Sequence, residues 1–227
     1  MRHFAGGFLW TVLLAMVTLG CQSVGMLPAG ESKGIGEGGR LQADAYSVGP
    51  VLSTDEMRRD AFTLHQQLRF SYAERSGKLE SVIQKNCDSL DVVGLGPLNI
   101  RIFTLRQIGR GIDYEPENLD DWPVSPLQIL NDIHRIYFYP LMTPAIQDSV
   151  QETQVGDVYV SEMWRSGRLR QRILSRPEGQ GAMRIRIDYL DGLVRDEAPG
   201  VVTLVDELRE YRLEVETVSF SLGECKK

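Results

Sequence analysis

The chain has 227 residues, a formal net charge of -6 at pH 7 and only three histidines. An acidic chain with a pI near 5.2 lacks the basic surface that nucleic-acid binding requires, so we expect no nucleic-acid partner. The length is sufficient for one domain with a substantial core, and no internal repeat is visible.

The first twenty residues have the pattern of an export signal. A short cationic start, Met1-Arg2-His3, precedes an uncharged stretch over residues 8–19. That stretch is shorter than the roughly 20 apolar residues of a membrane-spanning helix. We therefore predict a removable lipoprotein signal peptide over residues 1–20.

Cys21 resembles the lipobox cysteine of bacterial lipoproteins, which carries a diacylglycerol and begins the mature chain. The lipobox has Leu three places before the cysteine, whereas here Thr18 stands there and Leu19 follows. The resemblance predicts lipid attachment at Cys21, which would anchor the protein to a membrane through its acyl chains. In lipoproteins of enterobacterial type, Asp directly after the lipid-bearing cysteine marks retention at the inner membrane. This chain has Gln22 there, so the resemblance favours the outer membrane, with the protein facing the periplasm. The alternative is ordinary signal-peptidase cleavage, which would leave Cys21 as a plain thiol or remove it.

Residues 21–50 are rich in Gly and Ser and poor in apolar clusters, so we expect a flexible tether. The glycines of residues 34–39 have no predicted strand before them and no helix after them, which argues against a nucleotide-binding loop. The globular domain is expected over residues 51–227.

The first part of this domain alternates between apolar and polar residues. Leu64, Leu68 and Phe70 share one parity with Gln66, which predicts a strand with one buried face. A turn is expected at Ser76-Gly77, followed by a hairpin partner over residues 79–85. Further strands are expected over residues 89–95, 100–107 and 112–114.

A helical segment interrupts the strands. Ser125-Pro126-Leu127-Gln128 predicts a helix start, with Ser as N-cap, Pro at the first position and Gln bonding back to the cap. Leu127, Leu130, Ile133 and Tyr137 then follow at helical spacing. A second short helix is expected from Thr143-Pro144.

Alternation resumes over residues 157–165, 168–174, 183–190, 201–205 and 211–222. About nine antiparallel strands with a helical interruption predict a mainly β fold with a few short helices, in which the sheet curls around a helical plug.

The chemistry-bearing residues do not form a recognisable site. His65 and His134 are isolated in their patterns, and no Gly-x-Ser-x-Gly or Cys-x-x-Cys motif occurs. We therefore expect no enzyme, no catalytic residue, no cofactor and no metal site. Cys87 and Cys225 could form a disulfide in an oxidising compartment, or they could be a half-buried thiol and a tail thiol. The sequence leaves both readings open.

Several segments resemble a proteobacterial family of lipoproteins of unknown function that is similar in fold to LolA and LolB and is often encoded beside aryl-polyene biosynthesis genes. The resemblance covers about residues 55–220. It is carried by Gln67-Leu68-Arg69-Phe70, Val92-Val93-Gly94-Leu95-Gly96-Pro97-Leu98, Arg101-Ile102-Phe103-Thr104-Leu105, Leu130-Asn131-Asp132 and Tyr211-Arg212-Leu213-Glu214-Val215-Glu216-Thr217.

The resemblance implies a half-open antiparallel β-barrel with a helical lid, whose concave apolar face holds acyl chains. LolB receives lipoproteins from the periplasmic carrier LolA, so a LolA-like carrier is an implied partner. It also has an exposed apolar loop, for which Val124 or residues 137–142 are the nearest candidates here. The residues expected to line a ligand cavity are Leu98, Phe103, Trp122, Leu130, Ile133, Trp164 and Ile185.

The functional hypothesis is thus a lipoprotein that binds or transfers a lipid or acylated molecule, such as a lipoprotein or an aryl-polyene-type lipid. The alternative is a non-catalytic scaffold in envelope assembly. A third, an esterase or thioesterase, would require a nucleophile and a base within hydrogen-bond reach.

Overall fold

The computed structural model describes residues 40–42, 52–54, 57, 61–116, 124–139, 146–176, 182–194 and 197–225, with only the backbone described for 40–42. The chain divides into residues 1–35 and 36–227, and every described residue belongs to the second unit. The predicted signal peptide, Cys21, Trp122 and the second helix start at Thr143 lie outside the described residues.

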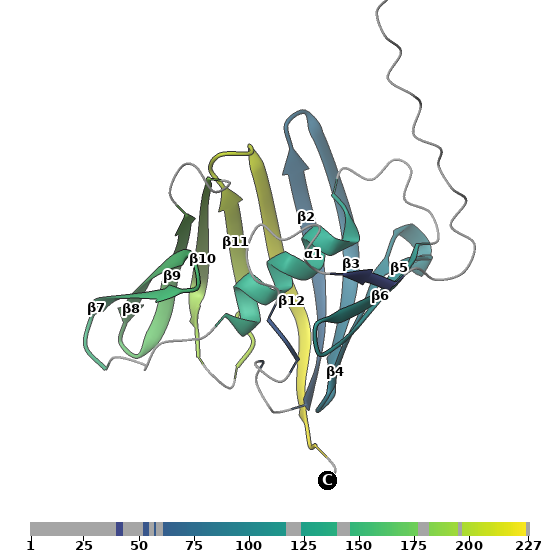
Figure 1. Ribbon diagram of the computed structural model, residues 1–227, viewed down its shortest axis with the longest axis horizontal. Helices are drawn as coiled ribbons and strands as arrows, with labels where there is room; N and C mark the ends of the chain where they lie inside the picture. The colour runs from purple at the N-terminus through teal and green to yellow at the C-terminus, as the bar shows by residue number, and fades with distance from the viewer. Residues whose placement is uncertain are drawn as a thin grey trace, which may run out of the picture. The chain divides into compact units, whose positions relative to one another are not determined.

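Twelve strands in the described part of the chain form one antiparallel sheet (Figure 1). They are β1 (Arg40–Gln42), β2 (Ala61–Tyr72), β3 (Arg75–Lys85), β4 (Ser89–Leu95), β5 (Arg101–Ile108), β6 (Gly111–Pro116), β7 (Ser149–Val155), β8 (Val158–Arg165), β9 (Arg168–Arg176), β10 (Met183–Leu193), β11 (Val201–Asp206) and β12 (Tyr211–Gly223).

The order of strands across the sheet is β1-β6-β5-β4-β3-β2-β12-β11-β10-β9-β8-β7. Strands β2 to β6 form one run of hairpins and β7 to β12 a second, and the two runs meet where β2 pairs with β12. The end strands β1 and β7 do not pair with each other, so the sheet is open. This confirms the predicted mainly β, half-open antiparallel fold.

The alternation along the strands corresponds to burial. In β2, Leu64, Leu68 and Phe70 are buried, whereas Thr63 and Gln67 are exposed. The strands expected after the helix also form, as β8 to β12. Two strands were not predicted. β7 is an edge strand with a largely polar sequence, and β1 lies inside the predicted tether and pairs with β6.

The first hairpin turn differs from the prediction. The loop is Ala73-Glu74, and Gly77 lies inside β3, opposite Phe70 of β2. A Cβ atom at Gly77 would lie 2.5 Å from the Phe70 ring. Gly77 therefore makes room for an aromatic ring and does not form a turn.

Helix α1 (Pro126–Ile133) begins as predicted, because the Ser125 hydroxyl accepts a hydrogen bond from the Gln128 backbone N–H at 3.2 Å. The side chain of Gln128 does not bond back to the cap; it donates to Asp132 Oδ1 at 3.0 Å. A π-helical segment, η3 (His134–Phe138), continues the helix.

Helix α1 crosses one face of the sheet, in front of β11, β12 and β2 in Figure 1. It is buried on nearly all sides, and Leu127, Ile129, Leu130 and Ile133 join the same hydrophobic cluster as the inward-facing strand residues. Within the described ranges, no helix has the length and apolarity that crossing a membrane would require.

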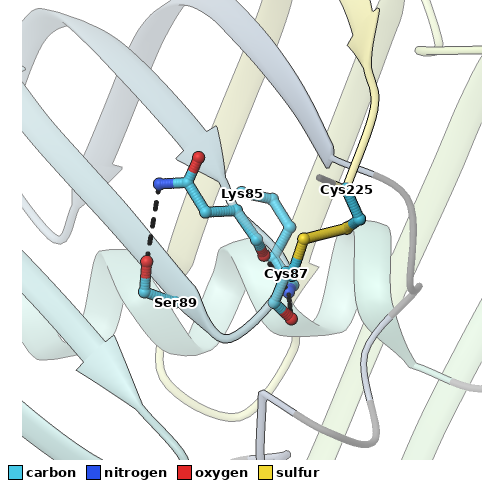
Figure 2. The surroundings of a disulfide bond; sticks show 5 residues. Lys85, Cys87, Ser89 and Cys225 are labelled. Atoms are coloured by element: carbon cyan, nitrogen blue, oxygen red, sulfur yellow. Dashed lines mark hydrogen bonds between the residues drawn. A yellow bond between two sulfur atoms is a disulfide. The ribbon is translucent and has the colours of Figure 1, made fainter. Parts of the chain in front are cut away.

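A disulfide joins Cys87, in the loop between β3 and β4, to Cys225, just after β12, with a Cα–Cα distance of 5.5 Å (Figure 2). The ammonium group of the buried Lys85 donates hydrogen bonds to the carbonyl oxygens of Asn86 and, at 2.9 Å, of Cys87. The structure thus settles the question that the sequence left open for this cysteine pair.

Candidate functional site: the concave face under helix α1

The face of the sheet that α1 covers is apolar but contains a set of buried polar side chains. Most of them lie at strand positions whose neighbours two places away are apolar, so that the fold places them inside; Arg172 has Leu174 on one side and Arg170 on the other. These residues are Gln66 of β2, Ser81 and Lys85 of β3, Gln107 of β5, Glu162 of β8 and Arg172 of β9.

Glu162 and Arg172 form a fully buried ion pair. They are opposite one another in the β8–β9 register, and Arg172 Nη2 lies 2.7 Å from Glu162 Oε1. Arg172 Nη1 also donates to the backbone carbonyl of Arg135 at 2.6 Å. One guanidinium therefore neutralises a strand carboxylate and binds the helical segment above it.

Asp132 is the charged centre of α1. Its carboxylate accepts hydrogen bonds from Arg135 at 2.8 Å, from Gln128 at 3.0 Å and from the Tyr211 hydroxyl of β12 at 2.8 Å. Burial raises the pKa of Asp132, and Arg135, Tyr211 and Gln128 act in the opposite direction. The pKa of Tyr211 is raised well above its usual value by burial and by Asp132.

Two further tyrosines connect η3 to the sheet. The Tyr189 hydroxyl of β10 donates to the carbonyl of Ile136 at 2.9 Å, and the Tyr137 hydroxyl donates to Gln66 Oε1 at 2.9 Å. Gln66 in turn donates to Ser81 Oγ at 2.9 Å. Burial raises the pKa of Tyr189 to about 12 and also raises the pKa of Tyr137. Both hydroxyls therefore remain neutral hydrogen-bond donors.

His134 joins the helical segment to the chain before β2. Its Nδ1 accepts the Leu52 backbone N–H at 3.2 Å, so Nε2 carries the proton and donates to Gln107 Oε1 at 2.9 Å. Gln107 also donates to the carbonyl of Leu52 at 2.8 Å. Burial, aided by Arg135, lowers the pKa of His134 to about 3, so the ring is neutral.

We call these contacts of α1 and η3 with Gln66, Gln107, Arg172, Tyr189 and Tyr211 the helix-binding network. Its donors and acceptors are paired with one another, which suits fixing a helix in place. In the described part of the chain, no group of three or more His, Cys, Asp or Glu side chains could hold a metal ion.

The predicted cavity residues fall in three places. Phe103, Leu130, Ile133, Trp164 and Ile185 are all buried in the one hydrophobic cluster. The structure therefore brings these five residues to the face that α1 covers.

Leu98 does not lie with them. It is 92% exposed in the 3-10 turn η2 (Pro97–Asn99), at a φ of 61° that few non-glycine residues adopt. Val124, a candidate for an exposed apolar loop, is instead buried. Trp122 lies outside the described residues.

The described region contains at least two pockets. One, of about 330 Å³, lies at the N-terminal end of α1 and is lined by Tyr72, Val124, Ser125, Gln128, Asp206, Arg209 and Tyr211. The other, of about 420 Å³, is lined by residues of β2, β3 and β12, among them Arg69, Lys78 and Arg212. Most of the residues that line each pocket are polar or charged.

Sequence reasoning missed the helix-binding network, although a signal for it was present. Gln66 stands between Leu64 and Leu68, and Glu162 between Val160 and Trp164. A polar residue among the alternate, apolar positions of a strand is expected to be buried, and a buried polar group needs a hydrogen-bond partner. The partner's identity, however, depends on contacts between distant segments.

The described chain is thus a half-open, antiparallel β-sheet protein with a helix fixed in its concave face. It belongs to the family described as protein of unknown function (DUF3261), whose model matches residues 63–219.

Several solved structures are similar to this chain, and two of them follow. One is the LolA superfamily protein NE2245 from Nitrosomonas europaea, with 11% identity over 82% of this chain and 94% of that one and a TM-score of 0.44. The other is a domain from Vibrio parahaemolyticus described as an outer membrane lipoprotein-sorting protein, with 10% identity over 77% and 89% and a TM-score of 0.36. No curated protein matches the sequence.

Proposed function

We propose that this chain is an exported lipoprotein, anchored at the outer membrane through Cys21, that binds or transfers an acylated molecule beneath helix α1. The cargo would be the acylated end of a lipoprotein or an aryl-polyene-type lipid, and a LolA-like carrier could deliver it. The observation that carries the proposal is the arrangement of a short helix over the apolar face of an open sheet.

The helix has the properties of a removable cover. With eight residues, α1 is too short to be stable on its own, so it is helical only while it is docked. Below it lie apolar side chains including Phe103, Trp164 and Ile185. An acyl chain that replaced α1 there would gain about 25 cal/mol for each Å² of apolar area removed from water.

The η2 turn fits a role at a membrane surface. Leu98 and Ile100 are 92% and 60% exposed on the connection between β4 and β5. Apolar side chains at such a tip can enter the boundary between head groups and acyl chains of a bilayer. We infer that this turn contacts the membrane to which Cys21 would anchor the chain.

The alternative, a non-catalytic scaffold, is favoured by a different observation. The interior is occupied by α1, and most of the residues that line the two pockets described above are polar or charged. A scaffold would keep α1 docked permanently and bind no lipid.

The test begins with the full chain carrying Cys21→Ala, purified without detergent and analysed by native mass spectrometry. A bound mass in the range of an acyl or polyene lipid supports the carrier. A protein that retains no lipid and takes up none from added fatty acid contradicts it and favours the scaffold.

A second measurement tests the cover itself. Tyr189→Phe removes the hydrogen bond from β10 to the Ile136 carbonyl, and so should increase the fraction of molecules in which α1 and η3 are undocked. If docking is weakened by ~1 kcal/mol, the apparent affinity for an acyl chain should rise about fivefold. Tyr159→Phe, on the exposed side of β8, is the matched control and should leave affinity unchanged. Unchanged affinity in Tyr189→Phe would argue against opening at η3.

A further inference from the structure

Two uncharged polar groups on the concave face have no hydrogen-bond partner among the described residues: the indole N–H of Trp164 and the hydroxyl of Ser149. Trp164 is only 1% exposed, and both atoms are shielded from solvent. The large majority of buried side-chain polar groups in folded proteins are paired, and leaving one unpaired costs about 1–3 kcal/mol. Each therefore calls for a physical explanation.

The two residues that carry these groups are cross-strand neighbours. Ser149 of β7 and Trp164 of β8 are directly opposite in the antiparallel register. Side chains in this position point to the same side of a sheet, with Cβ atoms about 5 Å apart. In β8 that side also contains Val160 and Glu162, which are buried, so it is the concave side.

The pair lies at the free edge of the sheet. β7 is the last strand in the sheet order, so no further strand of the sheet covers Ser149 from beyond. On its other side Trp164 is opposite Leu169 of β9, which is fully buried in the hydrophobic cluster. The pair thus marks a boundary between the open edge and the apolar interior.

The chemistry of the pair selects a type of ligand atom. An indole N–H can only donate, and a serine hydroxyl can donate as well. Two donors on the same side of one cross-strand pair suit an oxygen with two lone pairs. The charged groups on this side of β8 and β9, Glu162 and Arg172, already neutralise each other, which favours an uncharged acceptor.

We propose that Trp164 and Ser149 form the subsite that receives the carbonyl oxygen of an acyl ester in the bound lipid. The acyl chain extends from there beneath α1, and the head group emerges at the β7 edge. This inference rests on the proposed lipid-binding function and specifies which group of the lipid is recognised.

The test uses two lipids that differ by the carbonyl alone: dodecanoyl lysophosphatidylcholine and its dodecyl ether. Binding of each to the full chain carrying Cys21→Ala is measured by calorimetry below the micelle concentration. We expect the ester to bind about tenfold more tightly, which corresponds to ~1.4 kcal/mol. Trp164→Phe and Ser149→Ala should each lower ester affinity to the ether level. Ser161→Ala, on the opposite side of β8, is the matched control and should keep the preference.

A second readout does not depend on lipid. Because Ser149→Ala removes a buried, unpaired hydroxyl and takes away a single atom, the melting temperature of the lipid-free protein should not fall. A fall would show that the hydroxyl is already satisfied within the protein, which overturns the inference.

The binding outcomes separate the two proposals. Equal affinity for ester and ether, or a preference that survives both substitutions, overturns the ester subsite and leaves lipid binding intact. Binding of neither lipid overturns both. If Trp164→Phe does not fold, the Ser149→Ala result decides.

Discussion

At His134, burial and two hydrogen bonds fix a neutral ring, and this has a consequence for acid stability. The pKa in the folded protein is about 3, whereas the unfolded chain has an ordinary value near 6.5. Below pH 6.5 the unfolded chain therefore binds a proton that the folded protein does not. The contribution of His134 to stability is complete above that pH and is lost, by about 1.4 kcal/mol per unit, as the pH falls towards 3.

Between pH 7 and pH 5 the free energy of unfolding should fall in the wild type, and the fall should be about 2 kcal/mol smaller in His134→Gln. Urea unfolding at the two pH values measures this difference. The raised pKa of Asp132 acts with the opposite sign but is common to both proteins, so the comparison isolates His134. Parallel pH profiles would mean that the ring is not held neutral.

Gly94 in β4 is the residue where backbone and aromatic packing depend most directly on each other. It is opposite Phe103 of β5, and a Cβ atom there would lie 2.2 Å from the Phe103 ring. Because Phe103 is 1% exposed, its ring cannot move aside freely. Gly94→Ala should lower the free energy of unfolding by about 1–3 kcal/mol.

The control for Gly94→Ala is the double variant with Phe103→Leu, measured with both single variants by chemical denaturation. If the clash is the cause, the alanine should cost less in the leucine background than in the wild type. If Gly94→Ala lowers the free energy of unfolding equally in both backgrounds, the destabilisation comes from the backbone of β4 and not from the clash with the ring.

Helix α1 depends at its start on a single side chain. The Ser125 hydroxyl accepts the Gln128 backbone N–H, and Ser125→Ala should lower stability by about 1 kcal/mol, whereas Ser125→Asp should retain it. Hydrogen exchange of the α1 amides is the measurement. Faster exchange confined to α1 would agree with a separately opening cover, and exchange that accelerates equally throughout the sheet would contradict it.

The regular elements were the part of the fold that the sequence could predict. Alternation in β2 and β10 and the cap at Ser125 are local patterns, and the structure contains each of these elements. β7 was not predicted because an edge strand buries little of either face, so its sequence does not alternate. The turn at Ala73 was not predicted because the glycine at position 77 makes room for the Phe70 ring of the neighbouring strand, and this contact cannot be seen within one segment.

The candidate site was predictable only in part. Apolar residues such as Leu130 and Trp164 were expected inside, and they are buried. Which polar groups meet there, as with Asp132 and Tyr211, depends on residues 79 positions apart. Such a pair leaves no local pattern, because neither residue is unusual within its own segment.

At the scale of the molecule, the described sheet is two runs of hairpins joined by one strand pairing. β2 and β12 pair along most of their lengths, from Tyr72 opposite Tyr211 to Ala61 opposite Gly223. β11 covers β12 only as far as Glu216, so beyond that point β12 has β2 as its remaining neighbour in the sheet. Such long-range pairings are slow to form and open first where they are covered least.

The disulfide crosses this junction. Cys87 belongs to the first run of hairpins and Cys225 follows the last strand of the second, 138 positions later. Closing so long a loop restricts the unfolded chain, which the chain-entropy model values at about 4–5 kcal/mol. We expect the Cys87→Ser, Cys225→Ser double variant to unfold at lower urea concentration and its β12 amides beyond Glu216 to exchange faster. Reduction should bring the wild type to the level of the variant and leave the variant unchanged. If reduction destabilises both proteins equally, the bond is not the cause, and the β2–β12 pairing and the contacts of α1 and η3 hold the two runs together without it.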